Sequence, residues 1–251
     1  MTGMDGVPQV DWESDPVDGG RMDLGHDAAM WLAGSRLTHF HVCAFFNSRE
    51  EEDQVLGPFH LDAARQGEQL LHLLAADQKD VHRAHLSDAG LATSHCEACG
   101  QLELRDWRTV CFDDEGDFDK QRLLESIDHW TGPARDVGFP RVRLMARMGQ
   151  LLQAAPDKAD VMEYEAEVND ILARHRQPAV CVYDIATLDG ATMMDLLRTH
   201  PLTLIAGVLR ENPFYTPPAE MLRELAARRG SRGGRHAGHR ETRTGALRAL
   251  R

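Results

Sequence analysis

The segment Thr38-His39-Phe40-His41-Val42-Cys43-Ala44-Phe45-Phe46-Asn47 decides the fold of this chain. It is an apolar run, rich in aromatic residues and bounded by polar ones, which predicts a buried strand over residues 38–46. Because side chains alternate along a strand, one face carries His39, His41, Cys43 and Phe45. The other face carries Phe40, Val42, Ala44 and Phe46. The second face is plain core, whereas the first combines imidazole, thiol and phenyl groups that packing alone does not require.

A helix is expected directly after this strand, since Ser48 and Glu51 have the spacing of a capping box. Many α/β proteins bind a phosphate where a strand runs into a helix N-terminus. The glycines and the lysine of a phosphate loop are missing here, and Glu50, Glu51 and Glu52 stand in their place. These carboxylates suit the helix dipole but repel a triphosphate, so the chain is not expected to bind ATP or GTP.

Strands and helices alternate along the rest of the chain. Further strands are expected at 68–75, 101–105, 140–148, 179–183 and 202–209. Helices are expected at 23–33, 48–66, 77–89, 118–137, 160–176, 189–199 and 218–228. This order predicts an α/β fold: a mostly parallel central sheet with helices on both faces, which makes a three-layer sandwich. The expected domain spans 37–227, preceded by a disordered acidic N-terminus with a short helix (1–36) and followed by an Arg-rich disordered tail (228–251).

Composition narrows the class of protein. The chain has 251 residues with 42% hydrophobic residues, enough for one sizeable α/β core. It contains no apolar run of about 18 residues and no signal peptide, which predicts a cytoplasmic protein without a membrane span. Five cysteines, an odd number, favour reduced thiols.

Charge is distributed unevenly along the chain. The net charge is −12, yet residues 228–251 carry eight arginines and one glutamate. The remaining residues form an acidic body that does not attract nucleic acid. Any nucleic-acid contact is expected to be weak and to involve only the Arg-rich tail.

Polar groups follow several of the expected strands. Tyr183 and Asp184 come at the carboxyl end of an apolar strand, where open α/β sheets bind ligands. Asp184 also has the position of a metal-holding acid, or of a helix cap. His200 ends a helix. It is either a ligand-binding group or a side chain whose positive charge interacts favourably with the helix dipole. Glu211 and Asn212 follow the last strand and line either a pocket or a turn.

Three other patterns have a functional and a plain interpretation. Cys96 and Cys99 have zinc-like spacing, but Cys111 is the only nearby further cysteine and no second pair exists. Cys43 beside His41 is either a nucleophile or an inert buried thiol. Glu165 and Asn169 are helix neighbours that we assign to a solvated face. No catalytic residue, metal site or cofactor is therefore predicted.

The ordered set of motifs resembles one known family. It consists of His41-Val42-Cys43-Ala44-Phe45-Phe46, Ser48 with Glu50 and Glu51, Gly100-Gln101-Leu102-Glu103-Leu104, Tyr164-Glu165, Val182-Tyr183-Asp184, His200-Pro201 and Glu211-Asn212-Pro213-Phe214. Over residues 37–227 this set is similar to the MEDS domain, the sensory domain named for methanogens, methylotrophs and a dichloromethane-responsive repressor. The resemblance implies a fold related to the RecA and KaiC ATPases that lacks the phosphate loop. It also implies a role in bacterial signalling, in which small hydrocarbon derivatives are sensed.

Three functional hypotheses follow. The first is a non-enzymatic sensor that binds a small molecule at the carboxyl ends of the central strands and signals to a protein partner, a kinase or a transcription regulator. Its expected ligand-binding residues are His41, Cys43, Phe45, Tyr183, Asp184, His200, Glu211 and Asn212. The second is an enzyme, either a degenerate nucleotide hydrolase or a thiol-dependent activity around Cys43. The third is a regulator that binds only other proteins.

Overall fold

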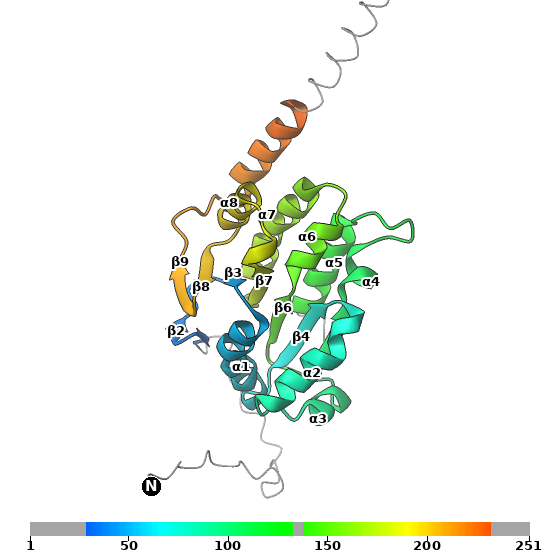
Figure 1. Ribbon diagram of the computed structural model, residues 1–251, viewed down its shortest axis with the longest axis vertical. Helices are drawn as coiled ribbons and strands as arrows, with labels where there is room; N and C mark the ends of the chain where they lie inside the picture. Colours follow the sequence, from blue (N-terminus) through cyan, green and yellow to red (C-terminus); the bar gives the residue numbers. More distant parts are fainter. Residues whose placement is uncertain (1–28, 133–137, 232–251) are drawn as a thin grey trace, which may run out of the picture.

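A computed structural model describes residues 29–132 and 138–231, and a seven-stranded sheet forms the centre of this part (Figure 1). The strand order is β5-β4-β6-β7-β3-β8-β9. The strands are β3 (His41–Phe46), β4 (Gln69–Leu74), β5 (Leu102–Asp106), β6 (Val142–Ala146), β7 (Ala179–Asp184), β8 (Leu202–Ile205) and β9 (Val208–Glu211). Neighbouring strands are parallel except for β8 and β9. The predicted mostly parallel sheet is confirmed.

Strand β3 lies between β7 and β8, and all six of its residues are buried. Its two faces enter different hydrophobic clusters, as the alternation predicts. Cys43 and Phe45 pack on one side of the sheet, while Val42, Ala44 and Phe46 pack on the other. The first face therefore differs from the second in chemistry as well as in direction.

Helices cover both faces of the sheet and complete three layers. The face that carries Cys43 is covered by α4 (Trp107–Cys111), α5 (Lys120–Thr131), α6 (Met148–Ala154), α7 (Lys158–His175), α8 (Gly190–Thr199) and the helical residues 218–231. The opposite face is covered by α1 (Arg49–Arg65), α2 (Lys79–Asp88) and α3 (Thr93–Ala98). Short 3₁₀ turns, η1 (Ala76–Gln78) and η2 (Ile185–Thr187), follow β4 and β7. In the described ranges no helix combines the length and the apolar character needed to cross a bilayer.

The predicted start of α1 is confirmed in detail. Ser48 has an extended backbone conformation, and its hydroxyl accepts a hydrogen bond from the backbone N–H of Glu51 at 3.2 Å. The Glu51 carboxylate in turn accepts from the backbone N–H of Asn47 at 2.8 Å. These bonds satisfy N–H groups at the helix start and fix the direction in which the chain leaves β3.

Two hairpins replace elements that the sequence predicted differently. Residues 29–33 of the helix expected at 23–33 belong instead to a hairpin of β1 (Trp31–Leu32) and β2 (Ser35–Arg36); residues 23–28 lie outside the described part. The single strand expected at 202–209 is the antiparallel hairpin β8–β9. Both hairpins turn on an Ala-Gly pair with positive φ, 48° and 73° at Ala33-Gly34 and 50° and 71° at Ala206-Gly207. Such pairs of positive φ angles reverse the chain in two residues.

The start of the predicted disordered tail differs from the prediction. Residues 228–231, assigned to a disordered tail, continue the last helix. Arg228 pairs with Asp195 at 2.8 Å, and Arg229 pairs with Asp160 on α7. The rest of the predicted tail, the N-terminal residues 1–28 and positions 133–137 lie outside the described residues.

A buried ionic network joins the amino ends of β4 and β6. The Glu68 carboxylate accepts hydrogen bonds from Arg141 Nη1 at 2.9 Å and from Arg143 Nε at 2.5 Å. Arg143 is 1% exposed and also donates to Asp62 at 2.8 Å. The buried Glu68 carboxylate thus pairs with two guanidinium groups inside the protein, an arrangement that is costly to break.

Candidate functional site

A cleft of about 370 Å³ opens at the carboxyl edge of the sheet. It lies where β3 leads into α1, β6 into α6, and β7 into η2. Its lining residues are Phe46, Ser48, Arg49, Glu52, Gln78, Arg147, Gly149, Gln150, Gln153, Val182, Tyr183, Asp184 and Thr187. This is the edge at which parallel α/β sheets bind ligands.

An ion triad forms part of the cleft wall. Glu52, on the first turn of α1, accepts hydrogen bonds from Arg147 Nη2 at 2.9 Å and from Arg49 Nη1 at 3.0 Å. Arg147 also donates to Gln78 at 3.1 Å. Burial raises the pKa of Glu52 to about 7, against the opposing charge of Arg49. The acidic helix start is therefore partly neutralised by arginine.

A second polar group of residues lies inside the protein, beneath the face of the sheet that carries Cys43. We call it the buried cluster; its members are His41, Glu165, Asn169, Cys181, Tyr183 and His200. Each is at most 7% exposed. His41 begins β3, and Cys181 and Tyr183 lie two apart on β7, so all three project toward α7. Glu165 and Asn169 come from successive turns of α7, and His200 is the residue that ends α8.

The Glu165 carboxylate is the centre of the buried cluster. The Tyr183 hydroxyl donates a hydrogen bond to Oε1 of Glu165 at 2.6 Å. The other oxygen, Oε2, lies 3.3 Å from Nε2 of His41 and 3.4 Å from Nε2 of His200. The Cys181 sulfur is 3.8 Å from the same Oε2 and 3.3 Å from Nε2 of His41. Five side chains from four segments of the chain, β3, α7, β7 and the end of α8, thus meet around Glu165.

The hydrogen-bond partners fix the tautomers of both histidines. The Asn169 amide NH₂ donates to the backbone carbonyls of Glu165 at 2.9 Å and Thr199 at 2.8 Å, so its oxygen accepts from Nδ1 of His41 at 3.2 Å. Nδ1 of His200 donates to the backbone carbonyl of Leu196 at 2.8 Å. With the proton on Nδ1, each neutral ring directs an unprotonated Nε2 toward Glu165.

Burial sets the charge state of these groups. Desolvation lowers the pKa of His41 to about 4 and that of His200 to about 3. It raises the pKa of the Glu165 carboxyl and raises that of the Cys181 thiol well above its usual range. The charged form of each group is disfavoured in the absence of a compensating ion.

The predicted site residues divide between the two places. His41, Tyr183 and His200 meet in the buried cluster, while Asp184 lines the cleft and caps η2 through a bond to the N–H of Ala186 at 2.9 Å. Tyr183 belongs to both, because it also lines the cleft.

Of the other four predicted site residues, three contact members of the buried cluster and one lies apart from both places. Cys43 pairs in register with Cys181, and the Phe45 ring lies 5.9 Å from that of Tyr183. Asn212 donates to the carbonyl of His200 at 2.7 Å. Glu211 is exposed on the edge strand β9.

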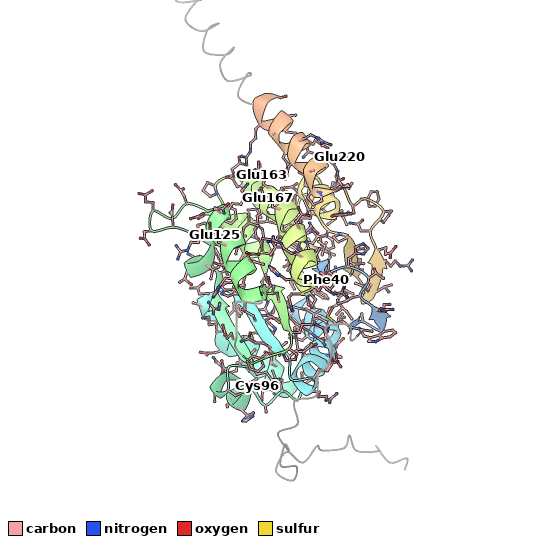
Figure 2. All side chains as sticks on the ribbon, turned by 180° about the vertical axis from the view of Figure 1, so that it is seen from behind. Phe40, Cys96, Glu125, Glu163, Glu167 and Glu220 are labelled. Carbon is pink, nitrogen blue, oxygen red and sulfur yellow. The ribbon has the colours of Figure 1, made fainter. Side chains whose placement is uncertain are left out.

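The assignment of Glu165 and Asn169 to a solvated face is wrong. Glu165 is 0% and Asn169 7% exposed. A signal was present, because positions 161, 165, 168 and 172 form one i, i+4, i+7, i+11 stripe on α7. The flanking acids Glu163 and Glu167, labelled in Figure 2, are half-buried, and both pair with Lys120, at 2.9 and 2.7 Å.

The zinc-like pair Cys96–Cys99 is not joined by Cys111. Cys96 packs with α1 and α2 on one face of the sheet, whereas Cys111 packs with α5 on the other. Cys99 is exposed, and the Cys96 thiol contacts Gln101 at 3.4 Å. Among the described residues this pair gathers no set of three metal-ligating side chains.

Comparison with known proteins identifies the family. A family model described as MEDS, the MEthanogen/methylotroph, DcmR Sensory domain, matches residues 40–201. That range includes every residue that lines the cleft and every member of the buried cluster. No curated protein matches the chain. The match covers more than half of the sequence, and the chain therefore belongs to the MEDS family of sensory domains.

Proposed function

We propose that the chain is a cytoplasmic, non-enzymatic sensor in bacterial signal transduction, and that it binds a small organic molecule in the cleft at the carboxyl edge of the sheet. Membership of a sensory-domain family supports the signalling role. The observation that carries the proposed binding site is the cleft itself: about 370 Å³, at the ends of β3, β6 and β7. Small-molecule sites are commonly concavities of this size with a few convergent polar groups.

The lining favours a ligand with an apolar part and a hydrogen-bonding head. Phe46 and Val182 offer apolar contact, while Gln150 and Gln153 offer amide donors and acceptors. Arg49 adds a guanidinium group whose side chain is 24% exposed. A short hydrocarbon derivative with a polar substituent fits this combination.

Signalling requires that the ligand bind two states of the protein with different affinities. Tyr183 offers a connection, because it lines the cleft and its hydroxyl holds Glu165 of α7. A ligand that displaces Tyr183 would alter the contact between β7 and α7. The output would pass to a protein partner, a kinase or a transcription regulator.

A blocked cleft tests the proposal. Thr187→Trp places a large ring at the cleft, and Thr109→Trp is its matched control. Both threonines are exposed, and each hydroxyl bonds to the carbonyl three residues earlier, at 2.9 and 2.8 Å respectively. Thr109 does not line the cleft. The assay measures the melting temperature of the full chain with a panel of short halogenated, hydroxylated and carboxylated hydrocarbons.

A ligand at about 100 times its Kd adds about 2.7 kcal/mol of stability and raises the melting temperature by about 5–10 °C. We expect this rise for the wild type and Thr109→Trp, and its loss in Thr187→Trp. If the compound still raises the melting temperature of Thr187→Trp, the ligand binds outside the cleft. If no compound of the panel stabilises the wild type, this ligand class is excluded. If mass spectrometry shows that a stabilising compound is chemically converted, the protein is an enzyme and the non-enzymatic proposal is wrong.

A further inference from the structure

We propose that His41, Glu165, Cys181 and His200 form a binding site for a divalent zinc-type cation. This inference is independent of the ligand proposed for the cleft. It departs from the sequence-based expectation of no metal site.

The positions of the four donor atoms carry the proposal. Nε2 of His41, Oε2 of Glu165, Sγ of Cys181 and Nε2 of His200 all lie within 4.8 Å of one another. The four separations given above are 3.3, 3.3, 3.4 and 3.8 Å. A tetrahedral zinc ion with bonds of about 2.0–2.3 Å requires its ligand atoms to be about 3.3–3.7 Å apart. Three of the six separations lie in this range, a fourth is 0.1 Å above it, and the remaining two are within 4.8 Å, so a small contraction would bring the four atoms onto such an ion.

The orientation of the histidines is an independent observation. Nε2 of His200 has no hydrogen-bond partner although the residue is 0% exposed. Its ring is held by the Nδ1 bond to the Leu196 carbonyl, and the His41 ring is held by the Nδ1 bond to Asn169. Imidazoles that bind metals are oriented in this way, by a hydrogen bond from the nitrogen that does not ligate.

Glu165 is also held for ligation. Its Oε1 is occupied by the Tyr183 hydroxyl at 2.6 Å, which leaves Oε2 to face the two histidines and the thiol. An outer hydrogen bond of this kind orients a carboxylate ligand. Three of the four donors thus have a fixed direction supplied by a neighbouring group.

The charge balance suits a dipositive ion. A thiol and a carboxyl group bind a metal ion in their deprotonated forms. Binding of the cation would release one proton from Cys181 and one from Glu165, so that two negative ligands offset two positive charges. The total charge of the buried site is the same before and after, and no unpaired charge is created in the interior.

The ligand set indicates the class of metal and its role. Imidazole with thiolate favours zinc over magnesium or calcium, which prefer oxygen ligands. Four protein ligands close the coordination shell, as in structural zinc sites. The ligands come from β3, α7, β7 and the end of α8, so the ion would fasten two helices to the two central strands.

Metal content of the full chain is the first measurement. We expect about one zinc per chain after expression with added zinc and purification without chelator. X-ray absorption of the same sample should give one sulfur and three nitrogen or oxygen neighbours. Zinc-free wild-type protein, or coordination by two or more sulfurs or by none, would overturn the site.

Cobalt substitution assigns the thiolate. Protein that is unfolded in chelator and refolded with Co²⁺ should show tetrahedral d–d bands and a thiolate-to-cobalt charge-transfer band. Cys181→Ser should abolish the thiolate-to-cobalt band. Cys43→Ser is the matched control, because Cys43 is an equally buried neighbour on β3 that is not among the four ligands. Cys96→Ser with Cys99→Ser should also retain the band. Loss of the band in either control, or its retention in a folded Cys181→Ser protein, would refute the assignment; if Cys181→Ser does not fold, the X-ray absorption result decides.

Discussion

Removal of a single oxygen atom tests the arrangement of the buried cluster. Tyr183→Phe deletes the hydroxyl that donates to Glu165 at 2.6 Å and leaves the aromatic ring in place. The ring keeps its packing against Phe45, at 5.9 Å between centroids. The change therefore isolates the hydrogen bond from the hydrophobic contribution of the residue.

The size of the effect follows from burial. Tyr183 and Glu165 are both 0% exposed, so water does not replace the lost donor. A buried acceptor left unsatisfied costs about 1–3 kcal/mol. For a chain of this length, 1 kcal/mol lowers the melting temperature by about 2–4 °C, so we expect a decrease of about 2–12 °C.

Urea denaturation of the wild type, Tyr183→Phe and Tyr164→Phe measures this cost. Tyr164 precedes Glu165 on α7 and is 4% exposed, but its hydroxyl has no hydrogen-bond partner among the described residues. Tyr164→Phe should stay close to the wild type, and Tyr183→Phe should have a lower midpoint with an unchanged slope. Equal stability of Tyr183→Phe and wild type, or equal losses in the two variants, would show that the hydroxyl does not hold Glu165.

Four further outcomes are expected. Glu68→Leu removes the buried carboxylate that pairs with both Arg141 and Arg143 and should cost about 3–5 kcal/mol by urea denaturation. In metal-free protein, prepared with chelator, burial lowers the pKa of His41 from 6.5 to about 4, so the unfolded chain binds more protons between these two pH values. His41 should therefore remove about 3 kcal/mol of the free energy of unfolding as pH falls from 6.5 to 4, and His41→Gln should flatten that slope. Ala206→Asn, which suits the positive φ of 50°, should add about 0.5–1 kcal/mol in the same assay. Calorimetry with Mg-ATP should give no binding heat, because the first turn of α1 carries Glu50, Glu51 and Glu52 and the glycines and lysine of a phosphate loop are missing.

The parts of the fold that were predicted correctly have strong local signals. Strand β3 is a continuous apolar run, and its alternation assigned Cys43 and Val42 to opposite faces of the sheet. Ser48 and Glu51 marked the start of α1 by a bond that is present in the structure. In these segments a single local interaction determines the conformation, so the sequence is sufficient.

The hairpins were missed because their turns lack the usual chemistry. A two-residue turn with positive φ at both positions favours Asn-Gly or Asp-Gly. Here the first position is Ala33 or Ala206, and alanine between apolar neighbours is indistinguishable from a continuing strand or helix. Pairing between strands overrides the local cost of the left-handed conformation, and that pairing is not visible in the sequence.

The candidate site was predicted only in part for a related reason. His41, Tyr183 and His200 were identified, but the carboxylate that joins them was not. Glu165 lies in a run of alternating acids, and only the packing of α7 on the sheet separates it from Glu163 and Glu167. The cleft residue Arg147 was missed because its role depends on contact with Glu52, from another layer of the fold.

The place of β3 in the sheet has a consequence for biosynthesis. β3 lies near the beginning of the sequence, yet both strands that pair with it, β7 and β8, come more than a hundred residues later. The nascent chain therefore exposes a largely apolar strand with unpaired edges until residue 205 has left the ribosome. Such long-range pairing makes folding slow and leaves the incomplete chain prone to aggregation. Efficient production of this protein is expected to depend on chaperones that shield residues 41–46 during translation.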